Sequence, residues 1–479
     1  MTAAQTPWTL LGLLSAVVFW EVVAHLPAAE FVIAAPSAIA LYVGDNLGLL
    51  LRALRTTLTN AAAGFAIGNL AAIMLATLAI TMPRSEALVR GLALLIFCLP
   101  LVATGPILRV IFGPGQWPQI VLAALAVYYT TLIPLLVGLR AVPSQWLDIV
   151  SSYGRGRIAA LVHVRASASL PYLVAGLQIA APAAFLGAMV GEFTGADRGM
   201  GVLTIRAMRA MDIEMTWALA TLATVVAILC FMAVGWIAGR FMSEPPPTIL
   251  AAPTSHRSPA LERALTPVVV SIVALALWGF GLKLLGLNPF FAKGPLDVFE
   301  TLARAPDAAE TRAILAAALG ETAVFLLPGY FVGLAAGALL AILVIQVPAI
   351  AGTATSLAVA LRSVPIITTA PLVILALGRG AAGTITLVVI MVFFPTFLAC
   401  LHGLRQAPGQ IVDVMRSYDA TRLAVLVHVR LPAMLPAFFA AARINVPASV
   451  LAVTVVEWLA TGQGIGSRTW TSTARRVAS

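Results

Sequence analysis

The sequence predicts an all-α membrane protein that crosses the bilayer many times and contains two tandem copies of one unit. Hydrophobic residues make up 61% of the 479 positions and charged residues only 10%, whereas soluble domains carry about a quarter charged residues. The apolar runs are long enough for a helix of about 20 residues to cross the hydrocarbon. They lack the alternation that indicates β-barrel strands.

An internal duplication supplies the second observation. Residues 140–171 and 405–436 repeat one polar, Arg-bearing pattern at a constant offset of 265 positions. The offset holds without a gap from Pro83 and Pro348 to Gly201 and Gly466, which indicates two copies of one structural unit. We expect three segments: a first transmembrane domain over 1–242, a Pro-rich linker over 243–265 and a second transmembrane domain over 266–479.

The apolar runs predict six spans in the first copy and five in the second. They cover 8–26, 56–80, 88–111, 117–139, 171–192 and 214–240, then 266–287, 320–345, 350–377, 381–403 and 436–457. By the 265 register, Ser479 pairs with Glu214 at the start of the sixth span. We therefore expect about 11 spans, with the last helix of the second repeat absent from the sequence given. An incomplete sequence is favoured over a natural loss.

The charge pattern predicts the orientation. The net charge of +10 comes almost wholly from arginine, and in a membrane protein basic loops mark the cytoplasmic side. We expect no nucleic-acid partner. The Arg-rich repeated loops, the linker and the N-terminus then all lie in the cytoplasm. Six spans per copy give both copies the same orientation, so a pseudo-two-fold axis along the membrane normal relates them.

The repeated polar stretch predicts a short helix in each copy that projects into water. Apolar residues recur at i, i+3, i+4 and i+7, which is one face of a helix. They are Trp146, Ile149, Val150 and Tyr153 in the first copy and Ile411, Val414, Met415 and Tyr418 in the second. Pro143 and Pro408 suit the first turn, and Asp148 and Asp413 lie on the opposite side.

A helix of this length is marginal alone in water, so its apolar face needs a cover. Either the face packs back onto the protein's own helix ends, or it docks on a partner. Duplication at the same place in both copies favours a partner.

The order Pro143, Asp148, Tyr153-Gly154 and Leu170-Pro171 resembles the "EAA" loop of ABC-importer permeases. The segment PLVATGPILRVIFGPG from Pro100 and its copy PIITTAPLVILALGRG from Pro365 are similar to the nitrate/sulfonate/taurine branch, as is Glu192 followed by Gly199-Met200-Gly201. The resemblance implies two fused type I permease repeats in the cytoplasmic membrane of a prokaryote. Its ATPase-coupling residues would be Pro143, Trp146, Asp148, Ile149, Tyr153, Gly154, Pro408, Ile411, Asp413, Val414, Tyr418 and Asp419.

The two copies depart from the family pattern in different places. Where the pattern has glycine after the coupling helix, the first copy keeps Gly154 and the second has Asp419, a residue that tolerates the left-handed backbone better than most. The pattern's Leu-Pro soon after the loop stands as Leu431-Pro432 in the second copy but as Ala166-Ser167 in the first. Each loop has therefore kept a different part of the family pattern.

The resemblance further implies that partners carry the chemistry. Two ABC subunits on the cytoplasmic side would bind ATP and Mg, and an extracytoplasmic solute-binding protein would deliver a small anionic or polar solute, such as nitrate, a sulfonate, taurine, bicarbonate or a vitamin precursor. The sequence has no G-x-x-x-x-G-K-[ST] loop and no metal-binding histidine spacing. We expect no cofactor and no enzymatic activity on this chain. The alternatives are a fused permease of an iron(III)- or thiamine-type importer and an ion-coupled secondary transporter.

Several residues within the expected spans are candidates for the solute path. Glu192 and Glu457 close apolar helices at matching positions, where an ionisable group faces a cavity or a partner rather than lipid. Each either caps the N–H groups of the following Gly-x-Gly turn or lines the path, and the two roles are compatible. Arg109, whose mate is Ile374, pairs with an acid, extends to the interface or attracts an anionic solute. Pro100 and Pro365 free backbone groups and could serve as bending points.

Overall fold

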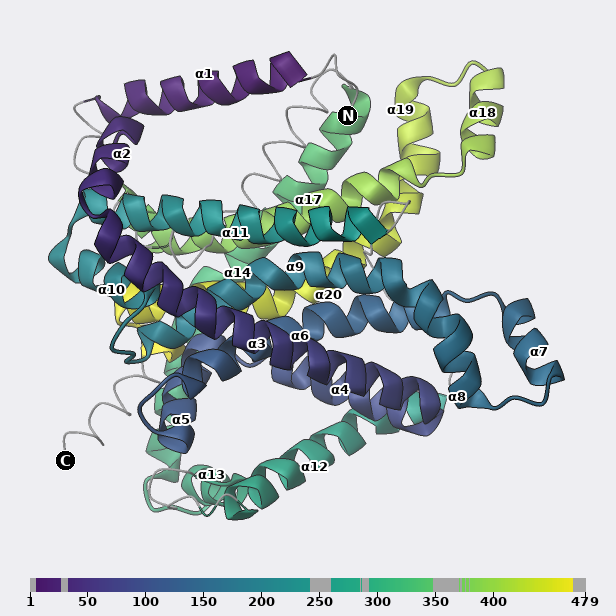
Figure 1. Cartoon of the computed structure of the whole chain (residues 1–479), viewed down its shortest axis with the longest axis horizontal. Coiled ribbons are helices and arrows are strands. Elements are labelled where there is room, and N and C mark those ends of the chain that lie inside the picture. Colours follow the sequence, from purple (N-terminus) through teal and green to yellow (C-terminus); the bar gives the residue numbers. More distant parts are fainter. Residues whose placement is uncertain are drawn as a thin grey trace.

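The computed structural model describes residues 6–26, 33–241, 260–284, 293–347 and 380–467, together with Gly286, 370, 373–374 and 376–378. Every element in these ranges is a helix (Figure 1). The first half contains α1 Thr6–Ala24, α2 Pro36–Asp45, α3 Leu47–Thr81, the 3₁₀ turn η1 Pro83–Ser85, α4 Glu86–Phe97, α5 Leu101–Phe112, α6 Trp117–Arg140, α7 Ser144–Ser152, α8 Arg157–Ala160, the π turn η2 Leu161–Arg165, α9 Ala166–Phe193, α10 Met200–Ala210 and α11 Ile213–Phe241. The second half contains α12 Ala260–Leu284, α13 Pro295–Ala303, α14 Ala308–Gln346, α17 Ala381–Arg405, α18 Gly409–Ser417, α19 Arg422–Val425, the π turn η4 Leu426–Arg430, α20 Leu431–Val456 and the π turn η5 Glu457–Thr461.

The two halves share one plan, as the duplication predicts. From α6 and α17 onward the elements α7, α8, η2 and α9 recur as α18, α19, η4 and α20, and these begin 265 positions later. Even the π turns match, because both form on the identical sequence LVHVR. Figure 1 shows α7 and α18 projecting at one end of the molecule, which we call the loop end, while α2 and α10 lie toward the opposite, far end.

Eight helices in the described ranges are long and apolar enough to cross a membrane. They are Leu47–Thr81, Trp117–Arg140, Arg157–Phe193, Ile213–Arg240, Leu265–Leu284, Ala308–Gln346, Ala381–Arg405 and Arg422–Val456. This arrangement confirms the predicted class of a polytopic helical membrane protein with tandem repeats. The predicted span over 350–377, including Pro365, and the linker residues 243–259 lie almost wholly outside the described residues.

One predicted span is not continuous. The sequence predicted a single helix over 88–111, but α4 ends at Phe97 and α5 begins at Leu101. Pro100 precedes α5 with ψ of 114°, an extended conformation. Proline has no N–H to donate to the preceding turn, so the apolar run is divided into two short helices.

Small residues let the helices of each half approach closely, as is typical of membrane helix packing. Along α9, a Cβ added to Gly187 would lie 2.9 Å from the Cα of Ala123 on α6, and one added to Gly191 would lie 2.6 Å from the Cα of Gln119. At the loop end, a Cβ added to Gly138 of α6 would lie 2.7 Å from the Cβ of Tyr172 on α9. Helices α6 and α9 are therefore in contact along their length.

The halves meet through two sets of contacts. Near the far end, Phe193 at the end of α9 stacks on Trp458 with ring centroids 6.0 Å apart, within a cluster that includes Val190, Val455 and Val456. Helix α12 of the second half packs against α4 of the first half. The aromatic cluster therefore joins the halves near the far end, and α12 and α4 supply a second contact between them.

The close packing predicts a stability effect at Gly333 on α14, where a Cβ would lie 2.8 Å from the Cβ of Val392 on α17. We expect Gly333→Leu to force α14 and α17 apart and destabilise the protein by about 1–3 kcal/mol. The melting temperature of the purified chain in detergent measures the effect. Gly320→Leu is the matched control, because an added Cβ meets nothing within 4 Å at that position of the same helix. Equal melting temperatures for the two variants would contradict this packing.

Candidate functional site

Helices α7 and α18 are short projections with the same construction. Each has nine residues and follows a proline, Pro143 or Pro408, in an extended conformation. The sequence predicted these prolines in the first turn, but each lies at the position just before its helix. There, each proline carbonyl accepts the first helical hydrogen bond, from Trp146 N and Ile411 N respectively, at 3.1 Å.

The apolar face of each projection is exposed. Trp146, Ile149 and Tyr153 are 61%, 58% and 80% exposed. In the second copy, Ile411, Val414 and Tyr418 are 50%, 57% and 83% exposed. Side chains packed against the protein's own helix ends would be covered. Val150 and Met415, the remaining residue of each predicted face, are half-buried, and Met415 packs against the buried valines at the base of α18. Of the two possibilities left open by the sequence, the described structure therefore shows a face of which three of the four residues are uncovered.

Both projections end in the same turn. Gly154 has φ of +68° and Asp419 has φ of +54°, so both adopt the left-handed conformation. Gly154 N donates to Ser151 O and Asp419 N donates to Arg416 O, both at 2.9 Å. Aspartate is one of the few residues with a side chain that tolerates this region. The substitution at 419 therefore preserves the turn.

The carboxylates on the polar side of the projections are exposed to solvent. Asp148 is exposed, and Asp413 lies 3.9 Å from a guanidinium nitrogen of Arg416, with both side chains mostly exposed. An exposed pair at this distance contributes little to stability. Both carboxylates are therefore accessible to a partner's donors.

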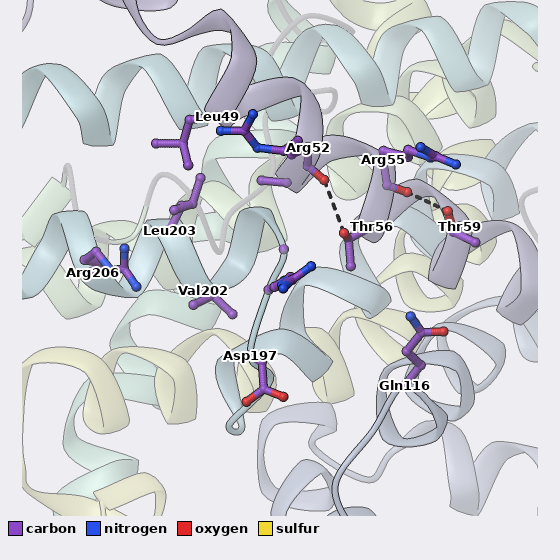
Figure 2. A pocket seen from close by; sticks show the side chains of 13 residues that line it. Leu49, Arg52, Arg55, Thr56, Thr59, Gln116, Asp197, Val202, Leu203 and Arg206 are labelled. Carbon is purple, nitrogen blue, oxygen red and sulfur yellow. Dashed lines mark hydrogen bonds between the residues drawn. The ribbon is translucent and has the colours of Figure 1, made fainter.

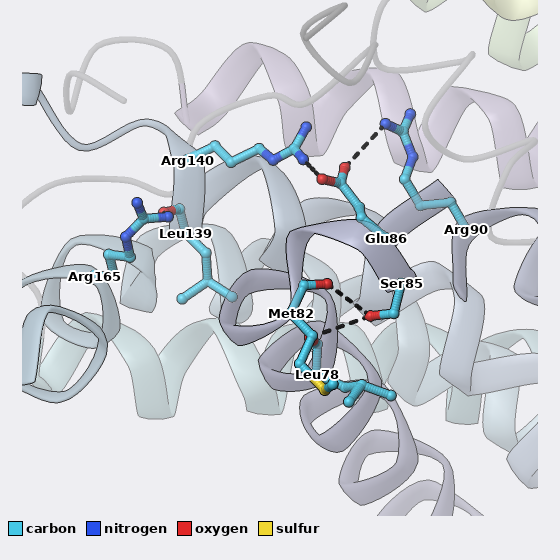
Figure 3. Close-up of polar contacts among 8 residues, drawn as sticks. All are labelled: Leu78, Met82, Ser85, Glu86, Arg90, Leu139, Arg140 and Arg165. Atoms are coloured by element: carbon cyan, nitrogen blue, oxygen red, sulfur yellow. Dashed lines mark hydrogen bonds and ion pairs between the residues drawn. The ribbon is translucent and has the colours of Figure 1, made fainter. Parts of the chain in front are cut away.

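The two loops are attached to their halves in different ways. In the first half, Glu86 forms ion pairs with Arg140 at the end of α6 and, at 3.5 Å, with Arg90, while Arg165 donates to the carbonyl of Leu139 at 3.2 Å (Figure 3). In the 265 register, Ala351 and Thr355 stand where the first half has Glu86 and Arg90.

The second loop is braced by apolar packing instead. Val412 on the inner side of α18 is buried against Val425 and Val429 of the following helix and π turn. The Glu86 contacts therefore join α4 to the end of α6, from which the first loop continues, and the Val412 contacts join α18 to the following helix and π turn.

Glu192 and Glu457 are buried, each with a matched set of donors. Glu192 is 1% exposed and accepts hydrogen bonds from Gly201 N at 2.8 Å and from the Thr57 hydroxyl of α3 at 2.8 and 3.0 Å. Thr57 in turn accepts from Met200 N at 2.9 Å. This cluster, which we call the first carboxylate node, ties α3, α9 and α10 together.

The second carboxylate node repeats the pattern. Glu457 accepts from Gly466 N at 2.8 Å, and Thr322 on α14 accepts from Ile465 N at 3.1 Å. Here Glu321 is an additional carboxylate that accepts from Gly464 N at 2.8 Å. Its mate in the first half is Thr56. Glycine is required at 199 and 464, because a Cβ at either position would collide with the carboxylate and φ is positive at both.

Both nodes have the capping geometry that the sequence suggested, and solute contact with Glu192 and Glu457 stays a prediction. Sequence reasoning missed Thr57 and Thr322. The sequence did contain a sign of them, because Thr57 and Thr322 are polar residues within two apolar helices and stand 265 positions apart.

Arg109 lies in the last turn of α5 beside the loop that follows α9, since a Cβ on Gly195 would be 2.6 Å from its guanidinium. It forms no ion pair with a residue in the described ranges. Arg109 thus lies beside the loop that joins α9 to α10, and its attraction for an anionic solute stays a prediction.

The first carboxylate node predicts that Thr57 stabilises the first half. We expect Thr57→Ala to leave a buried carboxylate short of a donor, at a cost of about 1–3 kcal/mol, while Thr57→Ser retains most of the stability. Melting temperatures of the purified variants check this. Thr59→Ala is the control, because the Thr59 hydroxyl donates only to its own helix at Arg55 O. A Thr57→Ala melting temperature equal to that of the control would refute the assignment.

Comparison with known proteins identifies the family. The profile of the family described as binding-protein-dependent transport system inner membrane component matches residues 64–243 and again 311–479. A probable ABC transporter permease protein of Haemophilus influenzae is 27% identical over 237 residues, covering 49% of this chain and 96% of the relative. The formylaminopyrimidine transport permease protein ThiX of Halalkalibacterium halodurans is 26% identical over 225 residues, covering 47% and 90%.

A third relative, the putative aliphatic sulfonates transport permease protein SsuC of Escherichia coli, is 33% identical over 106 residues, covering 22% of this chain and 40% of the relative. The first two relatives each align almost completely with about half of this chain. The chain belongs to the family of binding-protein-dependent transport system inner membrane components, with two copies of the family domain in one polypeptide.

Proposed function

We propose that this chain is the membrane permease of an ATP-driven importer in which α7 and α18 are the coupling helices. The observation that carries the proposal is the pair of exposed, amphipathic helices at one end of the molecule, with the same turn and the same register in both halves. Exposed apolar side chains that recur at helical spacing are typical of a helix that docks in a groove. The groove would be supplied by an ATP-binding ABC subunit, one for each loop.

The proposed mechanism uses the attachment of each loop. A partner that closes on ATP would pull on Trp146, Ile149 and Tyr153, and the pull would pass to α6 and α9, which are joined along their length by close glycine contacts. In the second half the pull on α18 would pass to α17 and α20, which pack together, with Gly403 of α17 against Met434 of α20. Because the halves meet through Phe193 and Trp458 near the far end, movement of the loops would rock the halves about that contact and open the path on alternate sides.

The solute and its delivery belong to the proposal as well. Relatives are named for formylaminopyrimidine, riboflavin, aliphatic sulfonates and nitrate. We propose a small anionic or polar solute, delivered at the far end by an extracytoplasmic binding protein. The loop end then faces the cytoplasm, together with the N-terminus and the linker over 243–265 that joins the domains 1–242 and 266–479. ATP and Mg would be bound by the partner subunits, so this chain would carry the path and no catalytic group.

Coupling through the apolar faces predicts a loss of transport when a charge is placed in them. We expect Ile149→Asp combined with Val414→Asp to abolish docking, because a carboxylate cannot be buried unpaired in an apolar groove. Solute-stimulated ATPase activity of the reconstituted complex should fall at least about 100-fold, consistent with a loss of about 2.7 kcal/mol or more. Ser151→Asp, on the polar side of α7, is the control and should retain activity. Full activity in the double variant would refute the coupling role.

A further inference from the structure

A basic cavity lies at the far end of the first half. It has a volume of about 690 Å³ and lies between the beginning of α3, helix α10 and the loop that joins α9 to α10 (Figure 2). Asp197 is the single acid among its lining residues. The four arginines that line it are Arg52, Arg55, Arg198 and Arg206. All four are exposed, and none forms an ion pair with a residue in the described part of the chain.

The cavity has an excess of positive charge, because four arginines line it and Asp197 is the one acid among its lining residues. The hydroxyls of Thr56 and Thr59 carry no charge, and they donate to the backbone carbonyls of Arg52 and Arg55 at 3.2 and 2.6 Å. Positive charges gathered in a cavity focus the electric field and raise the local concentration of anionic groups. The cavity is therefore suited to carboxylates or other oxyanions.

Hydrogen bonds of the first carboxylate node hold the backbone that carries most of these arginines. Arg198 lies on the loop between Glu192 and Gly201, which is held where Gly201 N donates to Glu192 and Met200 N donates to Thr57. Arg52 and Arg55 precede Thr57 on the same helix. Three of the four arginines are thus carried on backbone that the node holds in place.

The second half lacks the four arginines at the matching positions. In the 265 register, the counterparts of Arg52, Arg55, Arg198 and Arg206 are Ala317, Gly320, Gln463 and Thr471. Among all the counterparts of the lining residues, Arg468 is the single base and Glu321 the single acid. The two halves therefore present different charges at the far end, although they share one fold.

We propose that this basic cavity is the socket for acidic side chains on the extracytoplasmic solute-binding protein, and that it fixes which side of that protein sits on the first half. The inference rests on the proposed function. All lining residues belong to the first half, whereas a path formed between the halves would be lined by both, and this difference favours docking over passage of solute. Exposed charges at an interface set the association rate and orientation.

The test uses the complete complex with its ATPase subunits in phosphatidylcholine nanodiscs, titrated with the purified solute-loaded binding protein. We expect the combined variant Arg52→Glu, Arg55→Glu and Arg206→Glu to raise the half-maximal concentration for ATPase stimulation at least about ten-fold, with basal and maximal rates unchanged. Asp197→Asn should lower it. Added salt should weaken stimulation of the wild type more than that of the triple variant.

Two further variants keep the test interpretable. Arg209→Glu is the matched control, an exposed arginine on α10 that does not line the cavity, and it should change the half-maximal concentration less than about two-fold. The triple Arg→Gln variant removes charge without reversing it, and it should shift the concentration in the same direction if the Glu variant fails to assemble.

Three outcomes would overturn the socket. The first is equal stimulation of wild type and both triple variants, which removes the socket but leaves the importer function intact. The second is an arginine-dependent rise in melting temperature with sulfate alone and no change with the binding protein, which would mark a small-anion site. The third is an effect that appears only in phosphatidylglycerol nanodiscs, which would mark a lipid site. Absence of any stimulation in the wild type would instead count against the proposed function.

Discussion

The close contact between α6 and α9 is the constraint on which the rest of the structure depends. Gly138, Gly187 and Gly191 remove the side chains that would hold these helices apart. In hydrocarbon there is no hydrophobic drive between helices, so van der Waals contact at small residues supplies much of the association. Since α7 is attached between these two helices, any force on α7 is applied to a packed pair rather than to a flexible loop.

The duplicated plan does not make the halves equivalent. The first loop is braced by the carboxylate of Glu86 between two arginines, and the second by the buried side chain of Val412. At the other end, Glu321 adds a carboxylate to one node, and the arginines of the basic cavity occur only in the first half. One polypeptide with two different halves can bind an asymmetric partner in a single orientation, which two identical subunits cannot do.

The sequence predicted the elements that depend on local pattern. The 265 register placed α7 and α18, the apolar runs placed most long helices, and the residue preference of the left-handed backbone predicted the turn at Asp419. Three features could not be read from the apolar pattern. The division of the predicted span over 88–111 arose from Pro100, which the apolar run concealed. Thr57 meets Glu192 across 135 positions of chain. The ion pairs of Glu86 need α4 folded back on α6.

The most direct test of the account is site-specific cross-linking from the projections. Cysteine is placed at Tyr153 or Tyr418 in a variant whose Cys98, Cys230 and Cys400 are replaced by serine, and a short bifunctional reagent is applied to the assembled complex. If α7 and α18 dock on ATP-hydrolysing subunits, both positions cross-link to such a subunit and ATP changes the yield, while cysteine at Arg209 gives no such product. Cross-links from neither projection, or labelling of both by a membrane-impermeant reagent applied outside intact cells, would contradict the account.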